Sequence, residues 1–228
     1  MLSIPGFSDP VSSLTHLAAA LVFALMGPFL IARGRGARPV SSLVVFVFSC
    51  VLLLSLSGVY HLLTPGTAGR SVLMRLDHAA IFVLIAGSFS PVHAILLRDL
   101  WHWHLLAWIW ALAIAGLVLK TVYFDAMPQW LGLLMYLGLG WLGLISTIAL
   151  ARRFGLRFVL PLVWGALAYT IGALVDFLEW PVPIAGVVGP HEVFHLAVVA
   201  GIAFHWAFIR DIAGALDAEV AVLGFRAG

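Results

Sequence analysis

The chain has 228 residues, of which 63% are hydrophobic and only 10% are charged, and its formal net charge is +2 with histidine neutral. Soluble domains carry about a quarter charged residues, so this composition excludes a protein whose whole surface faces water. The few basic residues lie between apolar stretches, which excludes a nucleic-acid-binding patch. The single cysteine, Cys50, excludes a disulfide framework and a cysteine-based metal site.

Long apolar segments predict an all-α polytopic membrane protein, a seven-transmembrane-helix bundle that forms one domain over residues 1–228. The predicted spans run over residues 11–32, 40–63, 71–97, 105–123, 129–151, 158–180 and 190–209. Each is near the ~20 residues that cross a hydrocarbon core. Prolines, glycines and charges fill the connections. The N-terminus lacks the basic region and cleavage site of a signal peptide, so we expect the first span to be retained.

The arginines are distributed unevenly between the two sides of the predicted bundle. Most lie in the loops after the first, third and fifth spans, where Arg33, Arg98 and Arg152 are examples. The positive-inside rule places those loops in the cytoplasm and the N-terminus outside.

Ionisable residues from three predicted spans converge on the side at which the chain begins. The second span ends there with His61, and the third span begins there with Asp77. The seventh span also begins there, with His191 and His195 four residues apart. Ser57 precedes His61 by about one turn and shares its helix face. Ionisable groups at membrane depth are costly, so each is a functional candidate.

This constellation predicts a zinc site. Two histidines at i and i+4 bind one metal ion from a single helix face, and a third from a facing helix completes a set of three nitrogen ligands. Three protein ligands plus water are typical of catalytic zinc, which lowers the pKa of that water towards ~7. We predict His61, His191 and His195 as metal ligands, and Asp77 and Ser57 as catalytic residues that hold the water and the substrate carbonyl.

Each residue taken alone has a simpler explanation. A lone histidine near a span end is more often an interfacial or hydrogen-bonded residue than a ligand. Ser57 could be a small packing residue, Asp77 could pair with Arg75, and the carboxylates of Asp176 and Glu179 could be solvated. The histidines that we assign to this simpler class are His16, His93, His102, His104 and His205.

The segment from His191 to His195 also reads H-E-x-x-H, which in zinc proteases supplies two ligands and a glutamate base. An intramembrane metalloprotease would need a carboxylate ligand from another helix, for which Asp77 could be proposed. We favour the three-histidine set, because His61 is a better third ligand and Glu192 can face water at the start of the helix.

Several motifs, in order along nearly the whole chain, carry a resemblance to a known family. They are Ser12-Ser13-Leu14-Thr15-His16, Ser57-Gly58-Val59-Tyr60-His61, Leu76-Asp77-His78-Ala79-Ala80-Ile81-Phe82, Ile85-Ala86-Gly87-Ser88-Phe89-Ser90-Pro91, Tyr169-Thr170-Ile171-Gly172-Ala173 and His191-Glu192-Val193-Phe194-His195-Leu196. On these motifs the chain resembles the haemolysin III family of bacterial membrane proteins, within the progestin and adiponectin receptor group.

The resemblance implies seven helices, zinc on His61, His191 and His195, and an Asp77 that acts through water near Ser57. It implies residence in a bacterial plasma membrane, with the zinc side and the N-terminus in the cytoplasm, opposite to the side that the arginines indicate. Relatedness to alkaline ceramidases implies a lipid-amide hydrolase, whereas the family name implies pore formation or cytolysis.

Three functions are therefore expected alternatives. The first is a zinc-dependent hydrolase that acts on a lipid amide or ester and has membrane lipid as its partner. The second is a receptor or lipid-homeostasis protein without enzymatic activity, in which zinc is structural. The third is a pore-forming or cytolytic protein, which ranks last because the sequence has no pair of discontinuous helices and no charged ring.

Overall fold

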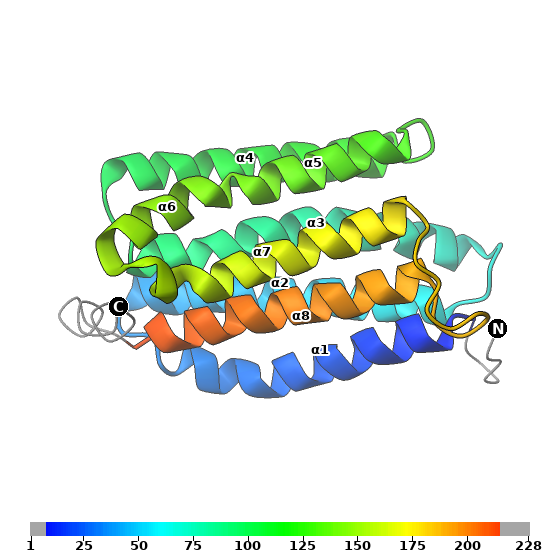
Figure 1. Ribbon diagram of the computed structural model, residues 1–228, viewed down its shortest axis with the longest axis horizontal. Helices are drawn as coiled ribbons and strands as arrows, with labels where there is room; N and C mark the ends of the chain where they lie inside the picture. Colours follow the sequence, from blue (N-terminus) through cyan, green and yellow to red (C-terminus); the bar gives the residue numbers. More distant parts are fainter. Residues whose placement is uncertain (1–7, 215–228) are drawn as a thin grey trace.

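The structure, a computed structural model, describes residues 8–214, most of which form long apolar helices that run side by side (Figure 1). Their bounds are α1 Pro10–Ile31, α2 Ala37–Leu62, α3 Ala68–Ile95, α4 Leu100–Val122, α5 Gln129–Trp141, α6 Gly143–Phe154, α7 Leu156–Phe177 and α8 Pro190–Ile212. With α5 and α6 counted as one span, seven of the described helical segments are long and apolar enough to cross a membrane. The predicted all-α, seven-span architecture is confirmed.

Helix α4 begins at Leu100, five residues before the predicted start at residue 105. Asp99 is its N-cap, and the Asp99 carboxylate accepts a hydrogen bond from the backbone N–H of His102 at 3.1 Å. Such a cap satisfies an N–H group that has no partner within the first helical turn. Polar residues that read as a loop in the sequence therefore belong to the first turn of the helix.

The predicted fifth span, residues 129–151, is interrupted by a break at Leu142 and continues to Phe154 as α6. Gly138, Gly140 and Gly143 surround the break, and glycine lowers helix stability by about 1 kcal/mol relative to alanine. Figure 1 shows α5 and α6 next to α4, on the far side of the bundle from α1.

The core lies mainly between α1, α2, α3 and α8. Phe46, Leu54, Ile202 and Ile209 are completely buried there. Other large apolar side chains point outward, and Phe29 is 77% exposed. In a membrane these outward side chains face lipid, so packing between the helices depends on close contact more than on the hydrophobic effect.

One end of the bundle gathers the helix ends that carry the predicted site residues. Figure 1 shows that α1, α3, α5 and α8 begin there and that α2, α4 and α7 end there. The backbone N–H of Asp9, just before α1, donates to the backbone carbonyl of His61 near the end of α2 at 3.0 Å. The helix order thus brings the predicted site residues to the same end.

Helices α1 and α2 approach each other most tightly around Gly58. The Ser13 hydroxyl donates to the Gly58 carbonyl at 2.8 Å. A Cβ added to Gly58 would lie 2.6 Å from Leu17 Cγ and 3.1 Å from the Leu17 backbone nitrogen. The backbone atom cannot move aside as a flexible side chain can, so the contact requires glycine.

We predict that Gly58→Ala lowers the free energy of unfolding by about 1–3 kcal/mol, because it overpacks this contact. The matched control is Gly138→Ala on α5, where an added Cβ meets nothing within 4 Å. The thermal unfolding midpoint of each purified variant in detergent measures the effect. Equal midpoints for Gly58→Ala and Gly138→Ala would contradict the close approach of α1 and α2.

Candidate metal centre

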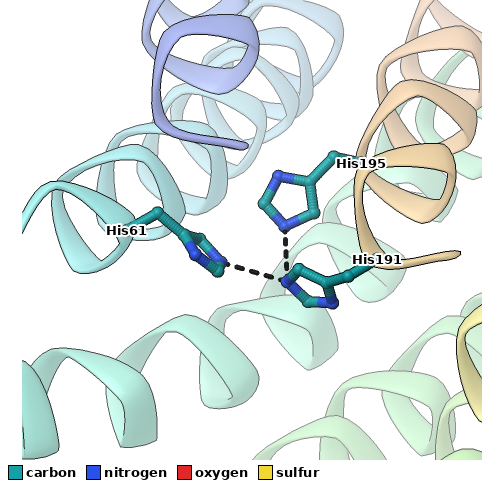
Figure 2. A group of neighbouring side chains, drawn as sticks. All are labelled: His61, His191 and His195. Carbon is teal, nitrogen blue, oxygen red and sulfur yellow. Dashed lines mark hydrogen bonds between the residues drawn. The ribbon is translucent and has the colours of Figure 1, made fainter. Parts of the chain in front are cut away.

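Three imidazole rings from two helices meet at this end of the bundle (Figure 2). His61 comes from the last turn of α2, and His191 and His195 come from the first turns of α8. The Nε2 atom of His191 lies 3.1 Å from Nε2 of His61 and 3.1 Å from Nε2 of His195. The three residues could hold one metal ion, and their potential ligand atoms all lie within 4.8 Å of one another.

The outer nitrogen of each ring contacts an oxygen, which determines where the ring carries its hydrogen. The Nδ1 atoms contact Asp9 Oδ2 at 3.0 Å for His61, Asp176 Oδ1 at 2.9 Å for His191, and the Ser12 carbonyl at 3.3 Å for His195. Ionised carboxylates and carbonyls only accept hydrogen bonds, so each Nδ1 donates. In the neutral rings every Nε2 then carries a lone pair that points towards the other two.

This donor set fits a transition-metal ion. Three lone pairs that face each other without a proton between them repel, and a cation removes the repulsion. An ion bound tetrahedrally at about 2.0–2.1 Å from each nitrogen separates the nitrogens by about 3.3–3.4 Å. Two of the three separations, from His191 to His61 and from His191 to His195, are 3.1 Å and close to that value, and all three potential ligand atoms lie within 4.8 Å of one another. Hydrogen bonds from ligand imidazoles to carboxylates are also usual around bound metals.

Asp9 connects the ends of three helices at the centre. Its Oδ2 accepts from both His61 Nδ1 at 3.0 Å and Arg70 Nη2 at 2.6 Å. Arg70 also donates to the Leu63 carbonyl, and its guanidinium lies 4.8 Å from the centre of the Tyr60 ring. Burial of Asp9 opposes ionisation, but the hydrogen bonds from His61 and Arg70 outweigh it and lower the pKa of the carboxyl group. Asp9 therefore remains a carboxylate beside His61.

Sequence reasoning assigned no role to Asp9 and treated Asp176 as solvated. The structure instead pairs Asp176, in the last turn of α7, with His191. The sequence did contain one indication of these roles, because both aspartates lie at span ends on the side that carries the histidines.

Glu192, the acidic residue of the H-E-x-x-H pattern, caps its own helix. One carboxylate oxygen accepts from the backbone N–H of Gly189 at 2.8 Å, and the other accepts from the Ser12 hydroxyl at 3.1 Å. These contacts give Glu192 a structural role at the start of α8.

Asp77 and Ser57 lie beside the three histidines. The Ser57 side chain interacts with the Asp77 carboxyl group, which is within electrostatic range of His191. Asp77 is not one of the described side chains that could share one ion directly. The catalytic roles of Asp77 and Ser57 remain predictions.

A cavity of about 940 Å³ extends from this end into the bundle between α3, α5, α6, α7 and α8. Asp77, Ser57, His191 and His195 line it at the polar end, and Val198 is one of the apolar residues that line it further along α8. The cluster therefore lies against an internal space large enough for a ligand.

Two more residues that line the cavity contain buried polar atoms without hydrogen-bond partners among residues 8–214. They are Nδ1 of His16 and the hydroxyl oxygen of Tyr169. The His16 ring stacks on His195 with 3.9 Å between centroids, and its Nε2 lies 3.2 Å from the His195 carbonyl. His16, which we assigned to the histidines that are interfacial or hydrogen-bonded residues and not ligands, packs directly against a candidate ligand.

Comparison with known proteins places this arrangement in a family. A model of the "Haemolysin-III related" family matches residues 7–206. The chain is 34% identical over 126 residues to the Hemolysin-3 protein of Bacillus cereus, and this segment covers 55% of this chain and only 54% of that protein. It is 32% identical over 184 residues to the Hemolysin-3 homolog of Bacillus subtilis (strain 168), with 80% of each chain covered.

We predict that Asp9→Asn and Asp176→Asn each weaken metal binding by about 10–100-fold, because a neutral amide orients the ligand imidazole less strongly than a carboxylate. The control is Asp125→Asn, which removes a carboxylate that pairs with Arg75 at 2.5 Å. Titration of metal-free protein with a divalent transition metal and a competing chelator measures the affinity. Wild-type affinity in both variants would contradict the orienting role.

Proposed function

We propose that this chain, which belongs to the haemolysin-III related family of integral membrane proteins, is a zinc-dependent hydrolase that cleaves an amide or ester bond of a membrane lipid. The observation that supports this proposal best is a three-histidine cluster that borders a cavity shared with a carboxylate. Catalytic zinc sites have three protein ligands and an open position, whereas structural sites usually have four protein ligands. In residues 8–214 the candidate ligand set consists of three histidines.

Zinc is the metal that we propose for the site, since a set of imidazole nitrogens suits it. When bound, zinc acidifies a water molecule and polarises a carbonyl group, which is the chemistry that amide hydrolysis requires. Within the protein, His61, His191 and His195 would hold the ion. Asp9 and Asp176 keep two of these rings oriented through their Nδ1–H groups.

Asp77 is the proposed general base. Its carboxylate accepts a proton from the attacking water and returns it to the leaving amine or alcohol. The location of Asp77 supports this role, because it lines the cavity and lies within electrostatic range of His191. Ser57 interacts with Asp77 and orients this carboxylate, and its hydroxyl is also available to the substrate carbonyl.

The cavity supports a lipid as the substrate. Its walls include Leu84, Leu162 and Val198, which suit an acyl chain, while the carboxylates that line it, Asp77, Asp176 and Glu179, lie at the histidine end. A volume of about 940 Å³ falls at the upper end of the range of small-molecule sites. We propose that the lipid comes from the surrounding bilayer, the plasma membrane of a bacterium.

A second candidate, in which the metal is structural, is supported by the position of the ligands. His61 lies on α2 and the other two histidines lie on α8, so one ion would crosslink two helices at the end of the bundle. In that case removal of the ion would lower stability, and no reaction would depend on Asp77.

We predict that purified protein contains one zinc ion per chain and releases fatty acid from a ceramide or a related lipid amide or ester. Asp77→Asn should retain zinc but lower kcat by about 100–10,000-fold, the usual contribution of a general base. His191→Ala should lose both zinc and activity. The control is His102→Ala, since His102 pairs with Asp99 at the other end of the bundle.

Metal analysis and a fatty-acid release assay measure both properties in the same preparations. A zinc-loaded wild type that cleaves none of these lipids, together with a lower unfolding midpoint after zinc removal, would contradict the hydrolase and support the structural alternative.

A further inference from the structure

Lys120 is a buried cation without an anionic partner in the described part of the chain. It lies in the last turn of α4, is 7% exposed and lines the cavity. Its Nζ lies 4.7 Å from the centre of the Phe124 ring, a cation–π contact. Asp125, which follows Phe124, is engaged by Arg75 at 2.5 Å. No acidic side chain within residues 8–214 forms an ion pair with Lys120.

A buried ammonium group without a counter-ion is costly. A helix C-terminus favours a cation by roughly 0.3–1 kcal/mol, but this benefit does not require the charge to be buried. The cation–π contact contributes about 0.5–2 kcal/mol. Neither effect explains why the ammonium faces a cavity instead of the surrounding solvent.

The charged end of Lys120 packs against Gly132 on α5. A Cβ added to Gly132 would lie 3.4 Å from Lys120 Nζ, so the ammonium lies directly against this part of α5. Gly132, Phe124 and Lys120 all line the cavity, which connects them with His191 and His195. Arg75 lies 5.3 Å from the other contact of Lys120, the Phe124 ring, but its charge is paired with Asp125.

We propose that the cavity binds an amphiphile with an anionic head group, a carboxylate or a phosphate, that pairs with Lys120. An ammonium group is a common partner for both anions, and a charge-assisted hydrogen bond is roughly twice as strong as a neutral one. The apolar chain of the ligand then occupies the part of the cavity lined by residues such as Leu84, Leu162 and Val198. The inference concerns binding and holds whether or not the metal centre hydrolyses the ligand.

The test compares charged and neutral ligands with the same apolar chain. The full-length protein in detergent is titrated with oleate and oleyl alcohol, and with dioleoyl phosphatidic acid and dioleoylglycerol, and binding is measured by native mass spectrometry. Lys120→Met should weaken binding of the two anions by about 10–100-fold and leave binding of the neutral ligands unchanged. Lys120→Arg should retain most of the anion affinity, because it keeps the charge.

The control for loss of one positive charge is Arg210→Met, because Arg210 is exposed near the end of α8 and pairs with its neighbour Asp211 at 2.9 Å. If Lys120→Met does not fold, Lys120→Gln replaces it in the same titration. Unchanged anion affinity in the neutral Lys120 variant overturns the proposal, as does wild-type protein that binds each neutral ligand as tightly as its anionic counterpart. If inorganic phosphate or acetate binds as tightly as the amphiphiles, the proposal of an amphiphilic ligand is wrong and the site binds small anions.

Neither result depends on turnover. If the protein hydrolyses a lipid but the neutral Lys120 variant keeps its anion affinity, the proposed function stands and the Lys120 site is excluded. If the variant loses anion affinity but the protein hydrolyses no lipid, the Lys120 site stands and the hydrolase is excluded.

Discussion

The arrangement at one end of the bundle depends on a single constraint: each candidate ligand imidazole donates its Nδ1–H to a fixed oxygen. These oxygens belong to Asp9 before α1, the Ser12 carbonyl in α1, and Asp176 in α7, while the rings belong to α2 and α8. The contacts therefore link four helices, and the same contacts force the three Nε2 lone pairs towards one point. Without them the rings could rotate, and the lone pairs would not converge.

The close packing of α1 against α2 serves this constraint. Asp9 can reach His61 only if the start of α1 lies next to the end of α2, and the backbone hydrogen bond from Asp9 to His61 holds it there. Gly58, one turn before His61, allows that approach. Arg70 then keeps Asp9 ionised and anchors it to the end of α2 through the Leu63 carbonyl. The close contact at Gly58 and the ionised Asp9 carboxylate thus both help to position His61.

The sequence alone was sufficient for the helices and for the grouping of His61, His191 and His195, because span order determines which helix ends share a side of the membrane. It did not reveal Asp9 and Asp176, since their contacts depend on how each helix is rotated about its axis. Apolar periodicity specifies such rotation poorly when lipid is as apolar as the core. The start of α4 was misplaced because Asp99 resembles a loop residue until its capping hydrogen bond is seen. The cavity was also beyond prediction, because it depends on the spacing of α5 and α6 from α7.

Most charged groups at this end of the bundle are paired, whereas three polar groups that line the cavity are not. Arg70 pairs with Asp9, Arg75 pairs with Asp125, and His191 pairs with Asp176. In contrast, Lys120, His16 Nδ1 and the Tyr169 hydroxyl have no hydrogen-bond or ion-pair partners in the described part of the chain, and all three residues line the cavity. Buried polar groups in proteins are normally satisfied, and exceptions concentrate where function requires them. The unpaired groups thus mark the cavity as a candidate binding site through side chains other than the three candidate ligands.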